Sequence, residues 1–106
     1  MFSTITAEEL KKKLDGGAKI RLIDVREPHE FDYCRIEGSE SMPLGRISEW
    51  GPTLSQDDEL VLLCHHGMRS QRACMLLAGN GFTHVTNLTG GIDQWSLTVD
   101  PEVRRY

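Results

Sequence analysis

The fold and the chemistry of this chain are both decided by residues 60–70, which read Leu60-Val61-Leu62-Leu63-Cys64-His65-His66-Gly67-Met68-Arg69-Ser70. The apolar residues that open this stretch are typical of a short strand that is covered on both faces. A glycine-containing loop follows, and a helical pattern begins near Ser70. We therefore predict that Cys64 ends a buried strand and that the loop leads from it into the start of a helix.

A thiol in that position lies in an electropositive environment. The N–H groups and the positive dipole end of the following helix point toward the sulfur. Gly67 lets the backbone turn without a Cβ clash, so consecutive N–H groups form an anion nest. Arg69 adds positive charge, directed either into the site or toward a nearby carboxylate. Such surroundings favour a thiolate. A core cysteine is the alternative, but these polar neighbours are unusual for one, and we predict that Cys64 is a nucleophile.

Strand-like and helix-like segments alternate along the chain, which predicts an α/β domain. We expect a mainly parallel central sheet of about five strands with helices on both faces. The sequence lacks a linker or an internal repeat, so residues 1–106 are expected to form one domain. In the helix that follows the loop, Ala73, Leu76 and Leu77 recur at helical spacing and are expected to face the sheet. The strands are expected at 19–25, 39–42, 60–63 and 84–88, and the helices at 6–14, from 28, at 45–50, at 70–77 and from 91.

Parallel strands bring segments that are distant in sequence to one rim. The carboxyl ends of such strands are where α/β proteins bind their ligands. Residues 24–26, 64–70 and 89–91 each follow a predicted strand and should meet there. Asp24 and Arg26 are therefore expected to support the site. A structural ion pair between them is the favoured interpretation, and guidance of anionic substrates by Arg26 is the alternative.

Composition excludes several classes of function. The net charge of −4 argues against a general nucleic-acid or membrane-surface binder. Three cysteines are an odd number, and their spacing fits neither a disulfide framework nor a zinc site, which favours a reducing compartment. The sequence shows no signal-peptide pattern and no apolar run near the roughly 20 residues needed to span a bilayer. We expect a soluble cytoplasmic protein, with a monomer as the default state.

Four segments, in order, resemble the rhodanese family of single-domain sulfurtransferases. They span residues 5 to about 97, nearly the whole chain. The chain departs from the family pattern at Cys34-Arg35, where Gly-His is usual, and at Ser39, where alanine is usual. The matching segments are Asp24-Val25-Arg26-Glu27-Pro28-His29-Glu30-Phe31, Ile36-x-Gly38 with Pro43, Cys64-x-x-Gly67-x-Arg69-Ser70, and Asn87-Leu88-x-Gly90-Gly91-Ile92-x-x-Trp95.

The resemblance implies a rhodanese-like fold and a transfer of sulfur in two steps, without a separate cofactor. The Cys64 thiolate would take the outer sulfur from a donor such as thiosulfate and hold it as a persulfide. A thiol, or cyanide, would then accept it. The expected partners are therefore small anionic sulfur donors and thiol acceptors, with a sulfur-relay protein as a further candidate. The persulfide would be bound by the loop residues His65, His66, Gly67, Met68, Arg69 and Ser70.

Two other functions remain open at this stage. A non-catalytic module for sulfur sensing or protein interaction is one, although inactive members of the family usually lack the cysteine that this chain retains. A cysteine-dependent phosphatase or arsenate reductase is the other. Tyrosine-phosphatase-like loops place one more residue between cysteine and arginine than the four that separate Cys64 from Arg69 here. A shorter loop makes a smaller nest, which favours a sulfur atom over a tetrahedral oxyanion.

The remaining histidines and cysteines have simpler interpretations. His65 and His66 are not predicted to bind a metal, because adjacent side chains seldom point into one site and the zinc spacing is missing. They are expected to act at the mouth of the site, where a protonated imidazole would favour the thiolate. Cys74 is expected to pack in the core. Cys34 is either an incidental loop residue or a second thiol that receives the sulfur.

Overall fold

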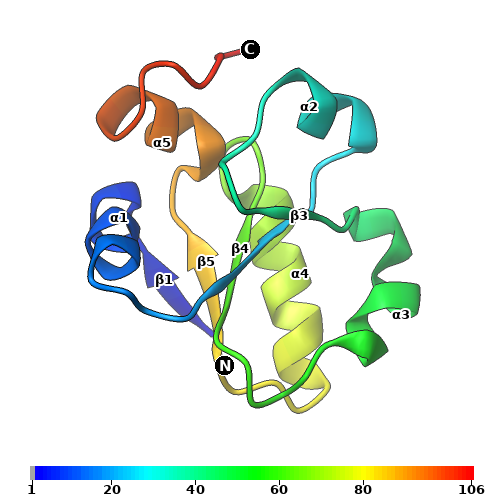
Figure 1. The fold of residues 1–106 in the computed structure, drawn as a ribbon. Coiled ribbons are helices and arrows are strands. Elements are labelled where there is room, and N and C mark those ends of the chain that lie inside the picture. Colours follow the sequence, from blue (N-terminus) through cyan, green and yellow to red (C-terminus); the bar gives the residue numbers. More distant parts are fainter. Residues whose placement is uncertain (1) are drawn as a thin grey trace.

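The computed structural model describes residues 2–106 and confirms the predicted α/β architecture, with a five-stranded parallel sheet between helices (Figure 1). Short apolar strands alternate with amphipathic helices, as the sequence pattern predicts. The elements are β1 (Ser3–Ile5), α1 (Ala7–Asp15), β2 (Arg21–Asp24), α2 (Pro28–Tyr33), β3 (Glu40–Ser41), α3 (Ile47–Trp50), β4 (Leu60–Leu63), α4 (Met68–Gly79), β5 (Val85–Leu88) and α5 (Gly91–Thr98), with 3-10 turns at Leu44–Arg46 and Gly51–Thr53.

The strand order places β4 at the centre of the sheet. The order is β1-β5-β4-β2-β3, and every neighbouring pair is parallel. Leu63 at the end of β4 pairs with Asp24 at the end of β2, and Leu62 pairs with Asn87 in β5. The carboxyl ends of these three strands therefore lie side by side, and the loop that follows β4 leaves the middle of the shared rim.

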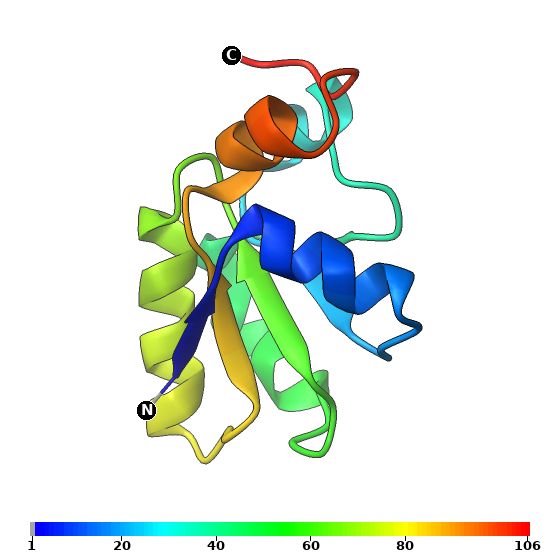
Figure 2. The same cartoon turned by 90° about the vertical axis from the view of Figure 1, so that its left-hand side faces the viewer.

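Helices lie on both faces of the sheet (Figure 2), and an apolar layer packs between sheet and helices on each face. All four residues of β4 are buried, as expected for a central strand with helices on both sides. One layer contains Trp50, Cys74 and Leu77 from the side of α3 and α4. The other contains Leu10 and Trp95 from α1 and α5. Cys74 is a core residue, as predicted, and so are Trp50 and Trp95.

One strand that the sequence did not locate and the earlier start of one helix are the main differences from the sequence prediction. The strand β1 has no counterpart among the four strands that the sequence located, because it is only three residues long and buries Ile5 alone. The helix α4 begins at Met68, two residues before the predicted start, because Gly67 adopts the left-handed conformation that caps it. This brings the helix dipole closer to Cys64. With 12 residues α4 is the longest helix, and none in residues 2–106 is long and apolar enough to cross a membrane.

The prediction for the inward face of α4 is correct for two residues and wrong for the third. Ala73 and Leu77 are buried, whereas Leu76 is 41% exposed. Ala73 and Leu77 are four residues apart and lie on one side of the helix. Leu76 is rotated from that line by about 100° relative to Leu77. It lines a surface pocket together with Ile47 and Pro52 and is not buried against the sheet.

Candidate active site

The thiol of Cys64 lies at the centre of the rim, between β4 and α4. Cys64 is 1% exposed. The Gly67 N–H donates a hydrogen bond to its Sγ at 3.0 Å, and the Ser70 hydroxyl lies 3.4 Å from the same atom. Gly67 has a φ of +107°, which favours glycine and aims this N–H back at the sulfur. A helix start and a directed N–H together stabilise negative charge on sulfur.

Asn87 in β5 fixes the loop from below, although the sequence analysis did not select it as a site residue. Its side-chain amide accepts a hydrogen bond from the Ser70 hydroxyl at 2.6 Å and donates one to the Gly67 carbonyl at 3.1 Å. Asn87 is 6% exposed. A buried amide needs such partners, so its polar atoms hold the loop in one conformation. The sequence feature that could have identified Asn87 as a site residue is its position, as a polar residue, inside a largely buried strand.

The start of α5 holds the first two loop carbonyls. The Ile92 N–H donates to the Cys64 carbonyl at 2.9 Å, and the Asp93 N–H donates to the His65 carbonyl at 3.1 Å. Gly91 makes this approach possible: it has a φ of +58°, and a Cβ there would lie 2.4 Å from the Cys64 carbonyl oxygen. The predicted meeting of residues 64–70 with residues 89–91 is therefore a direct backbone contact.

Gly91→Ala is expected to displace the active-site loop. The added methyl group meets backbone rather than a flexible side chain, and the left-handed conformation is strained for alanine. We expect the free energy of unfolding to fall by about 2 kcal/mol and the alkylation of Cys64 to slow by about tenfold. Gly45→Ala is the matched control, because a Cβ at Gly45 meets nothing within 4 Å. Equal unfolding and alkylation in both variants would contradict the close approach at Gly91.

Arg69 points toward a carboxylate rather than into the nest. Its guanidinium makes a bidentate pair with Glu30 of α2, with N–O distances of 2.6 and 2.9 Å. Hydrogen bonds from Arg69 are the main cause that lowers the pKa of Glu30 to about 2. The pair ties α2 to the first turn of α4. The sequence allowed Arg69 to point either into the site or toward a carboxylate, and the structure shows it pointing toward a carboxylate.

The stabilising effect of Glu30 is expected to depend on pH. Because folding lowers its pKa from 4.5 to about 2, the contribution is fully present above pH 4.5 and is lost as the pH falls toward 2. Denaturant unfolding of the wild type and of Glu30→Gln measures it. We expect the variant to be less stable by about 2 kcal/mol at pH 6, with a smaller difference at pH 3. A difference that stays constant between these pH values would refute the assignment.

Asp24 and Arg26 form a fully buried ion pair at the end of β2. Both side chains are 0% exposed. The Arg26 Nε lies 2.9 Å from one carboxylate oxygen of Asp24, and Nη2 lies 2.6 Å from the other. Nη2 also donates to the Cys34 carbonyl at 2.6 Å. Burial disfavours the cation, but these hydrogen bonds hold the pKa of Arg26 above its ordinary value. The geometry supports the structural interpretation, since Arg26 has no exposed surface to guide an anion.

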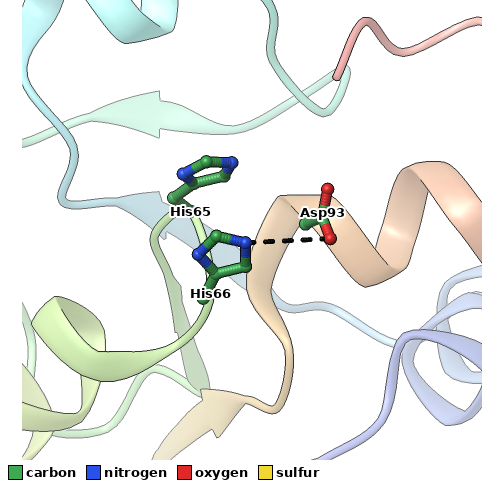
Figure 3. Close-up of side chains that lie close together, drawn as sticks. All are labelled: His65, His66 and Asp93. Carbon is green, nitrogen blue, oxygen red and sulfur yellow. Dashed lines mark ion pairs between the residues drawn. The ribbon is translucent and has the colours of Figure 1, made fainter. Parts of the chain in front are cut away.

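His65 and His66 stack on each other beside Asp93 of α5 (Figure 3). The ring centroids of the two histidines are 3.9 Å apart, and His66 Nε2 lies 3.8 Å from an Asp93 oxygen. These adjacent side chains thus lie together, although adjacent side chains were expected seldom to point into one site. Burial, followed by the neighbouring charge of His66, lowers the pKa of His65. The lowered pKa favours the neutral imidazole of His65, which argues against the positive charge considered for it.

The same three side chains offer possible metal-ligand atoms within 4.8 Å of one another. Their arrangement is poorly suited to a metal. Nearly parallel imidazole rings aim their nitrogens side by side rather than at one point, and Asp93 already accepts a hydrogen bond from Arg105 at 2.9 Å. Tetrahedral zinc needs its ligand atoms to converge at about 2.0–2.2 Å from the ion. That the chain binds no metal stays a prediction.

Met68 and Cys34 lie in positions that differ from the roles considered for them in sulfur binding and sulfur exchange. Met68 is 80% exposed, so its side chain points away from Cys64, and only its backbone remains available to a persulfide. Cys34 is buried in the apolar layer opposite to that of Cys64, and its sulfur faces Arg26 Nη1 at 3.6 Å. This placement favours a packing role for Cys34 over sulfur exchange. The cysteines of the chain are free thiols.

The parallel fold with a cysteine loop after its central strand defines a class of α/β domains, and comparison with known proteins places the chain in one family of that class. The chain belongs to the rhodanese family: a family model for the rhodanese-like domain matches residues 6–98. A solved rhodanese-related protein from Thermoplasma volcanium has a similar structure, with a TM-score of 0.85 and 28% identity, covering 99% of this chain and 100% of that one.

Two curated relatives contain a similar sequence within a longer chain. The probable adenylyltransferase/sulfurtransferase MoeZ of Mycobacterium tuberculosis is 40% identical over 98% of this chain, which corresponds to 27% of MoeZ. The putative sulfur carrier protein YrkF of Bacillus subtilis is 33% identical over 87% of this chain and 50% of its own length. The chain therefore spans a quarter to a half of the length of these relatives.

Proposed function

We propose that the protein is a sulfurtransferase that moves a sulfane sulfur from a donor such as thiosulfate to a thiol through a persulfide on Cys64. The observation that carries this proposal is the environment of the Cys64 sulfur, which lies 3.0 Å from a directed N–H at the start of α4. The names of the relatives support it, since one is named a sulfurtransferase and another a sulfur carrier.

In the first step the Cys64 thiolate attacks the outer sulfur of the donor. A new S–S bond forms to Cys64, the S–S bond of the donor breaks, and its electron pair leaves with the departing group, which is sulfite for thiosulfate. No oxidant is consumed and no general base is required once the thiolate is present. The reaction is covalent catalysis that divides one transfer into two displacements, and it needs no separate cofactor.

In the second step an acceptor thiolate attacks the outer sulfur of the persulfide and restores the Cys64 thiolate. The added sulfur lies one S–S bond, about 2 Å, beyond the Sγ of Cys64. The reacting atom is therefore farther out than the buried Sγ. That outer sulfur is anionic, and the N–H groups of residues 65–70 stabilise it in the manner of an oxyanion hole. The acceptor therefore does not need to reach the buried cysteine itself.

The physiological acceptor that we propose is a thiol of a sulfur-relay protein or a small thiol. The relatives MoeZ and YrkF, with their names of sulfurtransferase and sulfur carrier, support a place in sulfur relay. The net charge of −4 favours a protein or small-molecule partner over nucleic acid or a membrane surface. Free thiols suit a reducing compartment, so we propose the cytoplasm as the location and a monomer as the working state.

The geometry favours sulfur transfer over the two alternatives. In a phosphatase the arginine of the loop would contact the phosphate, whereas Arg69 is held in a bidentate pair by Glu30. A non-catalytic module does not need a thiol that accepts hydrogen bonds at a helix start. Both alternatives remain testable in the same assay.

Turnover with thiosulfate and cyanide tests the proposed function, with formation of thiocyanate as the readout. A persulfide of a small thiol serves as a second donor, and a phosphate ester serves as the control substrate. We expect turnover with at least one sulfur donor and none with the ester. Hydrolysis of the ester that depends on Cys64 would replace this proposal with a phosphatase, and the absence of both reactions would favour the non-catalytic module.

A further inference from the structure

Residues 99–106 follow the part of the chain that the family model matches, yet they fold back over the rim between α5 and α2 (Figure 1). Side-chain contacts fix this segment along its length. The Ser96 hydroxyl donates to the Val103 carbonyl at 2.6 Å, and Arg105 donates to Asp93 at 2.9 Å. The guanidinium of Arg104 lies over the ring of Tyr33, 5.6 Å from its centroid. The segment therefore has a defined path that ends at the active-site loop.

Tyr106 makes the contacts that matter for the site. Its ring lies flat on His65, with centroids 3.9 Å apart and an angle of 7° between the planes. Its hydroxyl donates to a carboxylate oxygen of Glu30 at 2.8 Å and accepts from Arg26 at 2.9 Å. The same Glu30 oxygen also accepts from Arg69 at 2.9 Å. One side chain thus contacts the residue next to Cys64 and both charged pairs that surround the loop.

We propose that Tyr106 is a positioning residue of the active site, which fixes His65 through its ring and the Glu30–Arg69 pair through its hydroxyl. This proposal rests on the proposed sulfurtransferase function. Tyr106 does not touch Cys64; it acts through the residues that follow Cys64 in the loop and at the start of α4. The segment that family comparison leaves out is then part of the working site.

The hydroxyl and the ring have separate effects, which makes them separable by substitution. Burial raises the pKa of Tyr106 to about 12, so the phenol keeps its proton and can donate to Glu30 at physiological pH. The ring, together with His66 on the other face, covers the imidazole of His65, whose Nε2 is buried without a partner. Loss of the ring would expose His65 to water, whereas loss of the hydroxyl alone would not.

An exposed His65 would protonate more readily. Desolvation is the main cause that lowers its pKa, and removal of the Tyr106 ring relieves it. The charged and titratable groups that act on His65 are His66 of the loop, Asp93 of α5 and Glu30 of α2, together with the backbone of Tyr106. Asp93 and Glu30 favour the imidazolium and His66 opposes it, so relief of desolvation is expected to raise the pKa of His65 from its lowered position. A mobile, charged His65 would no longer hold the loop in one arrangement.

The test compares Tyr106→Leu, which removes ring and hydroxyl, with Tyr106→Phe, which removes the hydroxyl alone, and with Glu102→Ala, a control at an exposed position of the same segment. We measure the NMR titration of His65, the alkylation rate of Cys64 by iodoacetamide, and kcat/KM for sulfur transfer. We expect Tyr106→Leu to raise the pKa of His65 and to slow alkylation and transfer by about tenfold. We expect Tyr106→Phe to leave the His65 titration unchanged and to slow both reactions about threefold, and Glu102→Ala to resemble the wild type.

Wild-type alkylation and kcat/KM in Tyr106→Phe, or an unchanged His65 titration in a folded Tyr106→Leu protein, would overturn the proposal. Should Tyr106→Leu not fold, Tyr106→Phe still decides, because it keeps the stack and removes only the hydroxyl, with its contacts to Glu30 and Arg26. The titration and the alkylation need no sulfur donor. They therefore test the role of Tyr106 even where sulfur transfer fails, and a failure of the proposed function would be visible in the wild type alone.

Discussion

Replacing Cys64 with serine is expected to abolish sulfur transfer, with kcat/KM reduced by at least about a thousandfold. A serine hydroxyl is not ionised near pH 7 and cannot form a persulfide, although it fits the same space and hydrogen bonds. The N–H of Gly67, which donates to the sulfur at 3.0 Å, would instead meet a neutral oxygen. The rate of thiocyanate formation from thiosulfate and cyanide measures the loss.

Cys74→Ala is the matched control for this substitution. Cys74 belongs to α4, is 0% exposed and packs in the core. Burial raises the pKa of its thiol to about 12. It therefore stays protonated and takes no part in the reaction. We expect Cys74→Ala to keep at least half of the wild-type turnover in the folded state. Equal losses in the two variants would show that Cys64 matters for packing rather than for chemistry.

Replacing Arg26 with methionine is expected to lower the free energy of unfolding by about 3–5 kcal/mol. Methionine fills much of the volume but leaves the carboxylate of Asp24 buried and unpaired, since both side chains are 0% exposed. The Cys34 carbonyl and the Tyr106 hydroxyl would lose a donor at the same time. Denaturant unfolding measures the change.

The same substitution at Arg21 provides the control for burial. Arg21 pairs with Glu40 at 2.8 Å, but these side chains are 35% and 38% exposed. Water can hydrate the carboxylate of Glu40 once Arg21 is removed. We therefore expect Arg21→Met to lower the free energy of unfolding by no more than about 1 kcal/mol. A similar loss in the two variants would contradict the assignment of Asp24 and Arg26 as a buried structural pair.

The architecture was predictable from sequence because its signals are local. The apolar run 60–63 with the following glycine loop is sufficient to place Cys64 at the end of a buried strand. The strand β1 carries no such signal, because three residues with one buried side chain form no periodic pattern. Its position follows from pairing with β5, a contact between the two ends of the chain. Leu76 shows the same limit, because its surroundings depend on where α3 packs.

The nucleophile of the candidate site was predictable from sequence, but the residues that hold its loop were predictable only in part. The chemistry of Cys64 follows from neighbours in sequence. The partners of the loop come from elsewhere: Asn87 from β5, Glu30 from α2 and Tyr106 from the segment that follows α5. Each is polar and partly or wholly buried, yet sequence alone does not show which buried polar groups meet. The stacking of His65 on Tyr106 joins residues that are 41 positions apart, and such a contact produces no periodic pattern in the sequence.

The central claim is that Cys64 carries the transferred sulfur. Intact-mass analysis after incubation with thiosulfate, or with a small-thiol persulfide, tests it most directly, with peptide mapping to locate the adduct. The account predicts a gain of one sulfur atom, located on Cys64, absent in Cys64→Ser and removed by an acceptor thiol or by cyanide. A protein that gains no sulfur from any sulfane donor, or gains it equally in Cys64→Ser, would contradict the account.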